Sequence, residues 1–249
     1  VILNVVGLSE AVLGASTPRM NEFARRGKKV AIIPAFPALT CSAQSTYLTG
    51  QTPAGHGIVG NGWYNRELAE VQFWKQSNHL VRGRKVWEEL RERQAGFTCA
   101  KLFWWYNMYS SADYSITPRP MYPADGRKVF DIYTSPLTIR DEIKKELGEF
   151  PFPAFWGPAA GVASPQGPPD AATRWIAAAA KWMEAKFQPT LNLVYLPHLD
   201  YNMQRLGTFH PAVAQDIGAV DAIVGDLIDY LEARSVAVPW MIRRLREPS

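Results

Sequence analysis

The sequence predicts an α/β fold in which helices cover both faces of a mostly parallel sheet. Short runs of apolar and β-branched residues recur along the chain, as at residues 1–8 and 191–196. The segments between such runs carry helix-start signals, in which Thr or Ser precedes Pro. Strands that alternate with helices are typical of parallel sheets, and ligands of such sheets bind beyond the carboxyl ends of the strands.

The individual elements follow from local patterns. The expected strands cover residues 1–8, 29–34, 97–105 and 191–196. The expected helices cover residues 17–27, 40–48, 136–147, 171–187 and 213–234. Gly27 and Gly50 are expected to end the first two helices, because glycine readily adopts the conformation that closes a helix.

Composition places the chain among ordinary globular proteins. Of its 249 residues, 47% are hydrophobic and 20% are charged, which is enough apolar material for a large core. The formal net charge of +4 is mild, suits anionic small molecules, and comes without any nucleic-acid-reading motif. No apolar run is long enough to cross a bilayer.

The cysteine count bears on the compartment. Two cysteines are too few for a disulfide framework or a zinc knuckle, so the expected setting is the reducing cytoplasm. The chain begins at Val1 inside an expected strand, so a removed signal peptide stays open as an alternative.

The segment after the expected second strand carries chemistry. A loop over residues 36–39 leads to Thr40, whose hydroxyl opens a helix. Free N–H groups and the positive end of the helix dipole favour a phosphate at such a place. A hydroxyl there can act as a nucleophile when a divalent metal coordinates its oxygen. By itself, the pattern also fits a threonine that only caps the helix.

Three short motifs support the first interpretation. The chain reads FPALT at residues 36–40, YLTG at residues 47–50 and PAGHGIVGN at residues 53–61. This succession resembles the type I phosphodiesterase/nucleotide pyrophosphatase family of the alkaline phosphatase superfamily. The resemblance spans most of residues 1–235 and implies an alkaline-phosphatase-like α/β domain.

The resemblance implies roles for several residues. Thr40 matches the family's nucleophile, which forms a covalent phospho-enzyme intermediate. Asn61 matches the residue whose amide holds a non-bridging phosphate oxygen, together with the N–H groups after Thr40. His56 is expected to tie its loop rather than to bind a metal. A sulfatase is excluded because residues 42–45 after Cys41 lack the required Pro and Arg, which leaves Cys41 as a packing residue.

The metal ligands are where the match weakens. The resemblance implies two zinc-like ions, and Asp200 matches one family ligand. Val6 stands where the family has Asp, and Gln204 stands where it has His. Asp200, Thr40 and Gln204 are therefore the expected metal ligands, with oxygen donors that suit Mg²⁺ or Mn²⁺ better than zinc. His198 is a weaker candidate.

The end of the chain also departs from the family, which would continue with a strand and an Asp-His pair. Residues 239–249 are instead basic and out of character. The prediction is one domain over residues 1–238, incomplete at the C-terminus, followed by an atypical basic tail over residues 239–249.

These observations predict a metal-assisted hydrolase of phosphate esters or phosphodiesters, with a nucleotide-like small molecule as substrate. The alternative is a non-catalytic homologue that binds phosphate esters without the metals. A phosphonate-processing relative would share Thr40 and stays open. The aromatic residues 103–106, with Trp63 and Tyr64, either stack on a flat group of the substrate or belong to the core. The oligomeric state does not follow from the sequence.

Overall fold

The computed structural model describes residues 1–156, 168–238 and 240–242, the last three by their backbone alone. Its main sheet has six strands in the order β6-β5-β4-β7-β1-β8. The strands are β1 (Ile2–Val5), β4 (Cys99–Leu102), β5 (Tyr114–Met121), β6 (Val129–Ser135), β7 (Leu191–Leu196) and β8 (Trp240–Ile242). All neighbours pair in parallel except β5 and β6, which confirms the predicted α/β class.

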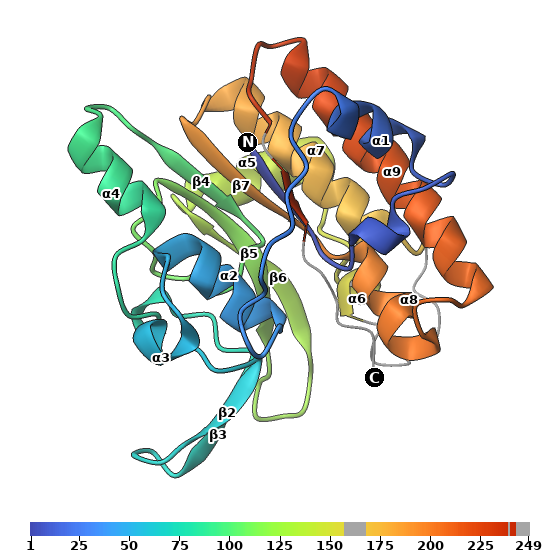
Figure 1. Ribbon diagram of the computed structural model, residues 1–249. Helices are drawn as coiled ribbons and strands as arrows, with labels where there is room; N and C mark the ends of the chain where they lie inside the picture. Colours follow the sequence, from blue (N-terminus) through green and yellow to red (C-terminus); the bar gives the residue numbers. More distant parts are fainter. Residues whose placement is uncertain (157–167, 239, 243–249) are drawn as a thin grey trace.

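Helices lie on both faces of this sheet, as Figure 1 shows. The helices are α1 (Pro18–Arg25), α2 (Thr40–Thr49), α3 (Pro53–His56), α4 (Val86–Arg93), α5 (Thr138–Leu147), α6 (Phe152–Trp156), α7 (Ala171–Lys186), α8 (His198–Leu206) and α9 (Pro211–Glu232), with 3-10 turns η1 (Glu10–Val12) and η2 (Asn78–Leu80). Helix α7 packs on β4 and β7, α9 packs on α7, and α1 packs on α9. Helices α2, α3 and α4 lie on the other side. None of the helices in the described ranges has the length and hydropathy of a membrane span.

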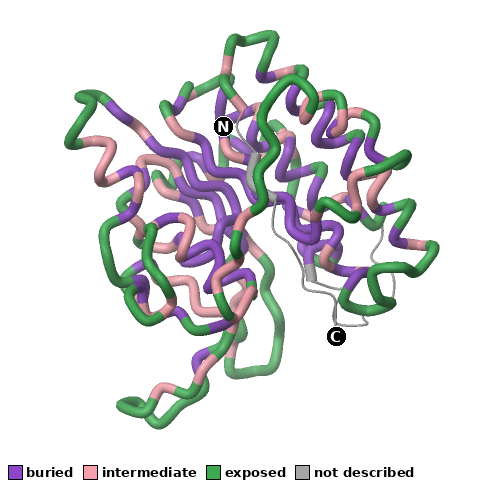
Figure 2. Tube along the Cα trace, in the orientation of Figure 1, coloured by how far each residue is buried: buried purple, intermediate pink, exposed green. Residues whose placement is uncertain are grey.

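The core runs through the centre of the main sheet, where the strands are buried. Leu3 and Val194 face each other in register and are both fully buried, as are Leu102 on β4 and Ile116 on β5. Figure 2 shows the strands of the main sheet as its most continuously buried part. Strands that are covered on both faces are mostly apolar, which is why β1 and β7 could be recognised as runs that are apolar apart from Asn4 and Asn192.

The predicted strand at residues 29–34 is wrong. This segment forms no strand, and the side chains of Val30 and Ile33 are 63% and 95% exposed. The two sides of β1 are occupied by β7 and β8, which arrive from distant parts of the chain. A β-branched composition supplies no hydrogen-bond partner by itself, so residues 29–34 cross the surface between α1 and α2.

A two-stranded hairpin that the sequence did not predict projects from the end of the molecule near α2 and α3. It consists of β2 (Gly62–Asn65) and β3 (Glu70–Phe73), which pair antiparallel. Figure 2 shows that most of its length is exposed. The hairpin begins one residue after Asn61, so its base helps to position that residue.

The predicted basic tail begins with a strand. Residues 240–242 pair in parallel with β1 as β8, next to the end of the predicted domain at residue 238. Residues 239 and 243–249 lie outside the described residues.

Candidate active site

Thr40 is the first residue of α2, as predicted. The residue before it, Leu39, is the N-cap and has extended backbone angles, and its side chain makes no capping hydrogen bond. Thr40 is 4% exposed, and its hydroxyl makes no hydrogen bond with any described residue. The hydroxyl therefore lies at the positive end of the helix dipole without an internal partner, where negative charge on its oxygen would be favoured.

Asn61 reaches the same helix end from 20 residues further along the chain. Its Oδ1 accepts the backbone N–H of Cys41 at 3.0 Å. Its backbone carbonyl accepts the N–H of Trp74 at 2.9 Å. Because the oxygen of the side chain is taken, its amide nitrogen is the end left to donate to a ligand.

This contact corrects one part of the sequence-based expectation. The N–H groups after Thr40 were expected to donate to phosphate, but the Cys41 N–H is already paired with Asn61. Leu39 has no side-chain acceptor for the free N–H groups of the helix start, so a distant side chain supplies one.

His56 ties its loop, as its sequence position suggested. Its Nδ1 accepts the Ile58 N–H at 3.1 Å, so the neutral ring carries its proton on Nε2, which lies 3.0 Å from Oγ1 of Thr46. Burial, and secondarily the charge of Arg82, lower the pKa of His56. Both ring nitrogens are engaged, which leaves no ligand atom for a metal.

A second apolar cluster includes Cys41, the residue after Thr40. Its buried members come from α2 and from the segments around it: Cys41, Ile58, Val81, Trp105 and Tyr106. Trp63, Trp74 and Leu80 pack against it from the hairpin side. Cys41 is thus a packing residue, and residues 103–106 are all buried, so they belong to the core and present no stacking surface. Trp63 remains half-buried and Tyr64 exposed.

Two of the three expected metal ligands, Asp200 and Gln204, lie on α8, directly after β7, whereas Thr40 lies on α2. Asp200 is in the first turn of this helix, and Gln204 lies one turn later. The Gln204 side-chain nitrogen donates to Oδ2 of Asp200 at 2.5 Å. The residue at the family's histidine position therefore offers its hydrogen atoms to the carboxylate.

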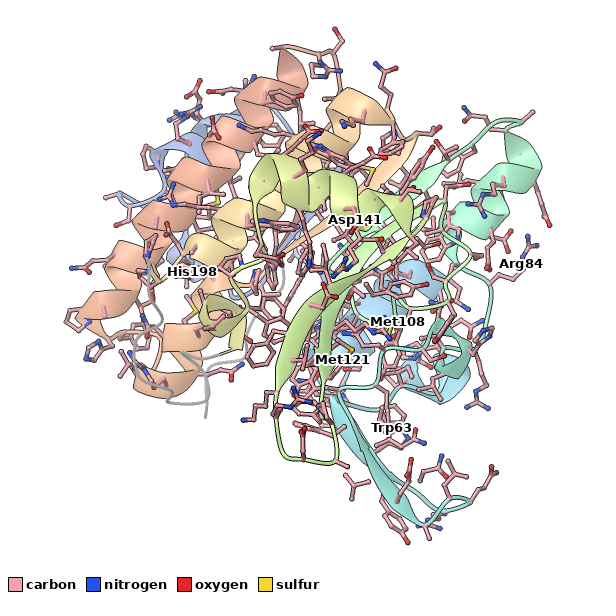
Figure 3. All side chains as sticks on the ribbon, turned by 180° about the vertical axis from the view of Figure 1, so that it is seen from behind. Trp63, Arg84, Met108, Met121, Asp141 and His198 are labelled. Atoms are coloured by element: carbon pink, nitrogen blue, oxygen red, sulfur yellow. The ribbon has the colours of Figure 1, made fainter. Side chains whose placement is uncertain are left out.

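Val6 and His198 also bear on the metal site. Val6 is aliphatic and buried. His198 is buried, and its Nε2 lies 3.2 Å from Oδ1 of Asp216 on α9. Figure 3 shows Trp63 on the hairpin side of the molecule and His198, the first residue of α8, on the opposite side.

The donor set can be tested against zinc. Zinc prefers imidazole and thiolate nitrogen and sulfur with some carboxylate. Within residues 1–156, 168–238 and 240–242, no three His, Cys, Asp or Glu side chains come together as they would around an ion. With Val6 apolar and Asp200 bonded to Gln204, these residues do not fit the two-zinc site that the family resemblance implies.

Two residues that support the candidate site were not predicted from the sequence. Gln44 on α2 and Lys101 on β4 are both buried, and both bond to the backbone around Trp105. The available signal was a lysine inside the apolar run FTCAKLFWW at residues 97–105. A charged residue in a buried strand calls for a partner and for an explanation.

Comparison with known proteins identifies the family of the chain. The model of the type I phosphodiesterase/nucleotide pyrophosphatase family matches residues 1–238, so the chain belongs to this family. A Schizosaccharomyces pombe protein described as an uncharacterized pyrophosphatase/phosphodiesterase is 24% identical over 230 residues, which cover 88% of this chain and 38% of that protein.

Solved structures share the fold. Murine ectonucleotide pyrophosphatase/phosphodiesterase 5 superposes with a TM-score of 0.58 at 16% identity, over 96% of this chain and 54% of its own. An inactive variant of that murine protein, with a threonine replaced by alanine, was solved with AMP. The alkaline phosphatase PafA gives a TM-score of 0.66 at 14% identity, over 94% of this chain and 59% of its own. The chain thus spans 38% to 59% of the length of these relatives.

Proposed function

We propose that the protein hydrolyses phosphate esters or phosphodiesters and that Thr40 is its nucleophile. The observation that carries this proposal is the junction of α2 with Asn61. It brings a hydroxyl without an internal partner, a helix N-terminus and an oriented side-chain amide to one place. Family membership over residues 1–238 supports the same chemistry.

The reaction then has two transfers. Oγ1 of Thr40 forms a bond to phosphorus as the bond to the leaving oxygen breaks, and the hydroxyl proton ends on the released alcohol. The Asn61 amide donates to a non-bridging oxygen, where negative charge grows in the transition state. Water then attacks phosphorus, which frees Thr40 and releases the phosphate product.

The metal stays a separate proposal. Asp200, Gln204 and Thr40 would supply oxygen donors, a set that suits Mg²⁺ or Mn²⁺ better than zinc. No step above depends on such an ion. Titration calorimetry with each ion measures this directly, and we expect weak zinc binding. Tight stoichiometric zinc would show that other residues are the ligands.

The proposed substrate is a small phosphodiester or a nucleotide-like molecule. The murine relative whose inactive variant was solved with AMP shares this fold, which supports a nucleotide-like ligand. The mild positive charge of the chain is compatible with an anionic substrate.

Hydrolysis of bis(4-nitrophenyl) phosphate by three proteins tests the proposal. Thr40→Ala should lower kcat by about 10³-fold or more, because it removes the nucleophile. Thr49→Ala is the matched control at the other end of α2, where the hydroxyl bonds only backbone within its own turn, and it should keep the wild-type rate. Mass spectrometry of the quenched wild type should find a 4-nitrophenyl phosphoryl group on Thr40, because only one nitrophenol leaves in the first transfer. Equal turnover by wild type and Thr40→Ala would refute the assignment, and binding without turnover would favour the non-catalytic alternative.

A further inference from the structure

Lys101 is a fully buried lysine in the middle strand region of the sheet. Its Nζ donates to the carbonyl oxygens of Trp105 at 3.0 Å and Tyr106 at 2.7 Å. Within the part of the chain that the structure describes, it forms no ion pair. Burying a charged amine without a carboxylate partner costs free energy. The presence of Lys101 at this place, bonded to two carbonyls, therefore calls for an explanation.

The protonation state of the Lys101 amine fits its two hydrogen bonds to carbonyls. Burial lowers the pKa of Lys101 to about 7, so the neutral form is accessible near physiological pH. A neutral amine has two N–H groups, which match the two carbonyls. The charged form adds a third N–H, and the ring of Trp87 lies 5.6 Å from Nζ to receive the positive charge.

The carbonyls belong to residues 103–107, which we call the Trp105 loop. Phe103 and Tyr106 have φ of 61° and 54°, a left-handed conformation that is unfavourable for a residue with a Cβ. The Asn107 amide donates to the carbonyls of Lys101 at 2.8 Å and Ile116 at 3.1 Å. A strained backbone of this kind persists only where its surroundings hold it.

One side of the Trp105 loop supports Thr40. The Trp105 N–H donates to Oε1 of Gln44 at 2.8 Å. Gln44 is buried on α2 and lies four residues, about one turn, after Thr40. The position of the helix end that carries Thr40 is thus tied to the backbone of Trp105.

The other side supports Asn61. The ring of Trp105 lies against the ring of Trp74, with centroids 4.5 Å apart. The Trp74 N–H in turn donates to the backbone carbonyl of Asn61 at 2.9 Å. The Trp105 loop is therefore linked to both proposed catalytic residues, Thr40 and Asn61.

We propose that Lys101 is a positioning residue: it holds the Trp105 loop in its strained conformation and so sets Thr40 and Asn61 relative to each other. This inference rests on the proposed function for its catalytic consequence. Its structural part, the link from Lys101 through Trp105 and Gln44 to the start of α2, stands independently of turnover.

Lys85 provides a matched control. It is also buried, and its Nζ also donates to two carbonyls, those of Val81 and Gly83, both at 2.8 Å. It makes no hydrogen bond to the Trp105 loop or to Gln44. Lys85→Met therefore removes a buried two-carbonyl contact of the same kind without cutting the link to Thr40.

The experiment compares three single variants, Lys101→Met, Lys85→Met and Gln44→Met. It also compares two double variants, in which Gln44→Met is combined with each lysine substitution. Unfolding midpoints in urea, kcat and KM for bis(4-nitrophenyl) phosphate, and amide hydrogen exchange are measured for all of them. We expect Lys101→Met to lower kcat about 10- to 100-fold with KM nearly unchanged, because displaced reacting groups cost transition-state alignment. Exchange at residues 40–44 should rise. Lys85→Met should lower the unfolding midpoint but change neither kcat nor the exchange at residues 40–44.

The double variants separate positioning from general weakening. Gln44→Met should add little to Lys101→Met, because both cut the same path, whereas its effect should multiply with that of Lys85→Met. The inference would be overturned if the effects of Gln44→Met and Lys101→Met on kcat multiplied in the double variant. It would also be overturned if Lys101→Met and Lys85→Met changed hydrogen exchange at residues 40–44 equally. If Lys101→Met does not fold, Gln44→Met alone must raise exchange at residues 40–44, and unchanged exchange there would overturn it equally.

Failure of the proposed function looks different. In that case Thr40→Ala would turn over substrate like the wild type, while hydrogen exchange would still report whether Lys101 controls the start of α2.

Discussion

Asn61 uses its two side-chain atoms differently. Its Oδ1 accepts the Cys41 N–H and so completes the start of α2, while its nitrogen is left to donate. Asn61→Asp separates these roles, because a carboxylate still accepts from Cys41 but donates nothing to phosphate and repels it. We expect kcat for a nitrophenyl phosphodiester to fall about 10²- to 10³-fold.

The urea midpoint of Asn61→Asp should stay close to that of the wild type, since the contact with Cys41 survives. Asn61→Ala loses both contacts, so it should lose rate and stability together. An Asn61→Asp variant with the wild-type rate would show that the amide does not hold a phosphate oxygen.

His56 makes stability depend on pH. Burial lowers its pKa in the folded protein below the ordinary value of 6.5. As pH falls below about 6.5, the unfolded chain takes up the proton first. The stabilising contribution of neutral His56 is therefore present above this pH and lost as pH falls through the lower folded pKa.

Urea unfolding of the wild type and of His56→Asn between pH 7.5 and pH 5 measures this effect. Asn can still accept the Ile58 N–H in a local turn but does not titrate. We expect the acid-induced loss of stability to be smaller in this variant, and His79→Asn, at an exposed histidine, to behave like the wild type. Parallel pH curves for wild type and His56→Asn would contradict the assignment.

At the scale of elements, α1 begins at Thr17-Pro18 as predicted, but its cap comes from elsewhere. The Thr17 hydroxyl contacts Gly14 and caps no N–H of the helix. The N–H groups of Arg19 and Met20 donate instead to the carboxylate of Asp221 on α9, at 3.0 and 2.8 Å. One buried side chain therefore both completes α1 and joins it to α9.

Asp221→Ala should accordingly lower the free energy of unfolding by about 2–4 kcal/mol, because it leaves one buried and one partly buried N–H group without an acceptor. Asp226→Ala is the control on the same helix, where the carboxylate is exposed and pairs with Lys181, and it should cost about 1 kcal/mol or less. Chemical denaturation of both variants gives the comparison. Similar losses would mean that Asp221 does not carry the α1–α9 contact.

At the scale of the whole molecule, the surface between α1 and α2 is unusually apolar. Val30 and Ile33, on the segment that was predicted to be a strand, and Phe36, in the loop after it, are all exposed. A cavity of about 620 Å³ lies beside it, lined by residues that include Met20, Phe23, Val30 and Val238. Contiguous apolar surface favours association.

We expect this chain to self-associate at micromolar concentration and Ile33→Lys to reduce that association, as measured by sedimentation velocity. Val71→Lys serves as the control, because Val71 is 70% exposed and lies on a different element, strand β3 of the projecting hairpin. A greater effect of Val71→Lys would move the associating surface to the hairpin.

The sequence by itself determined the elements whose signals are local. Apolar runs identified β1 and β7, and Pro and Gly punctuation identified the ends of α1 and α2. The motif around Thr40 identified the family, and the structure places that residue first in its helix as expected. These features depend on backbone propensities and neighbouring residues, which a sequence displays directly.

Only the tertiary structure decided which groups meet. Residues 29–34 have the composition of a strand but no partner, since β7 and β8 occupy both sides of β1. Asn61 pairs with Cys41, which lies 20 residues away in the sequence. Lys101 supports the Trp105 loop by a contact across that loop. Such contacts depend on burial and on unmet hydrogen-bonding groups, which come into existence only when the chain has packed.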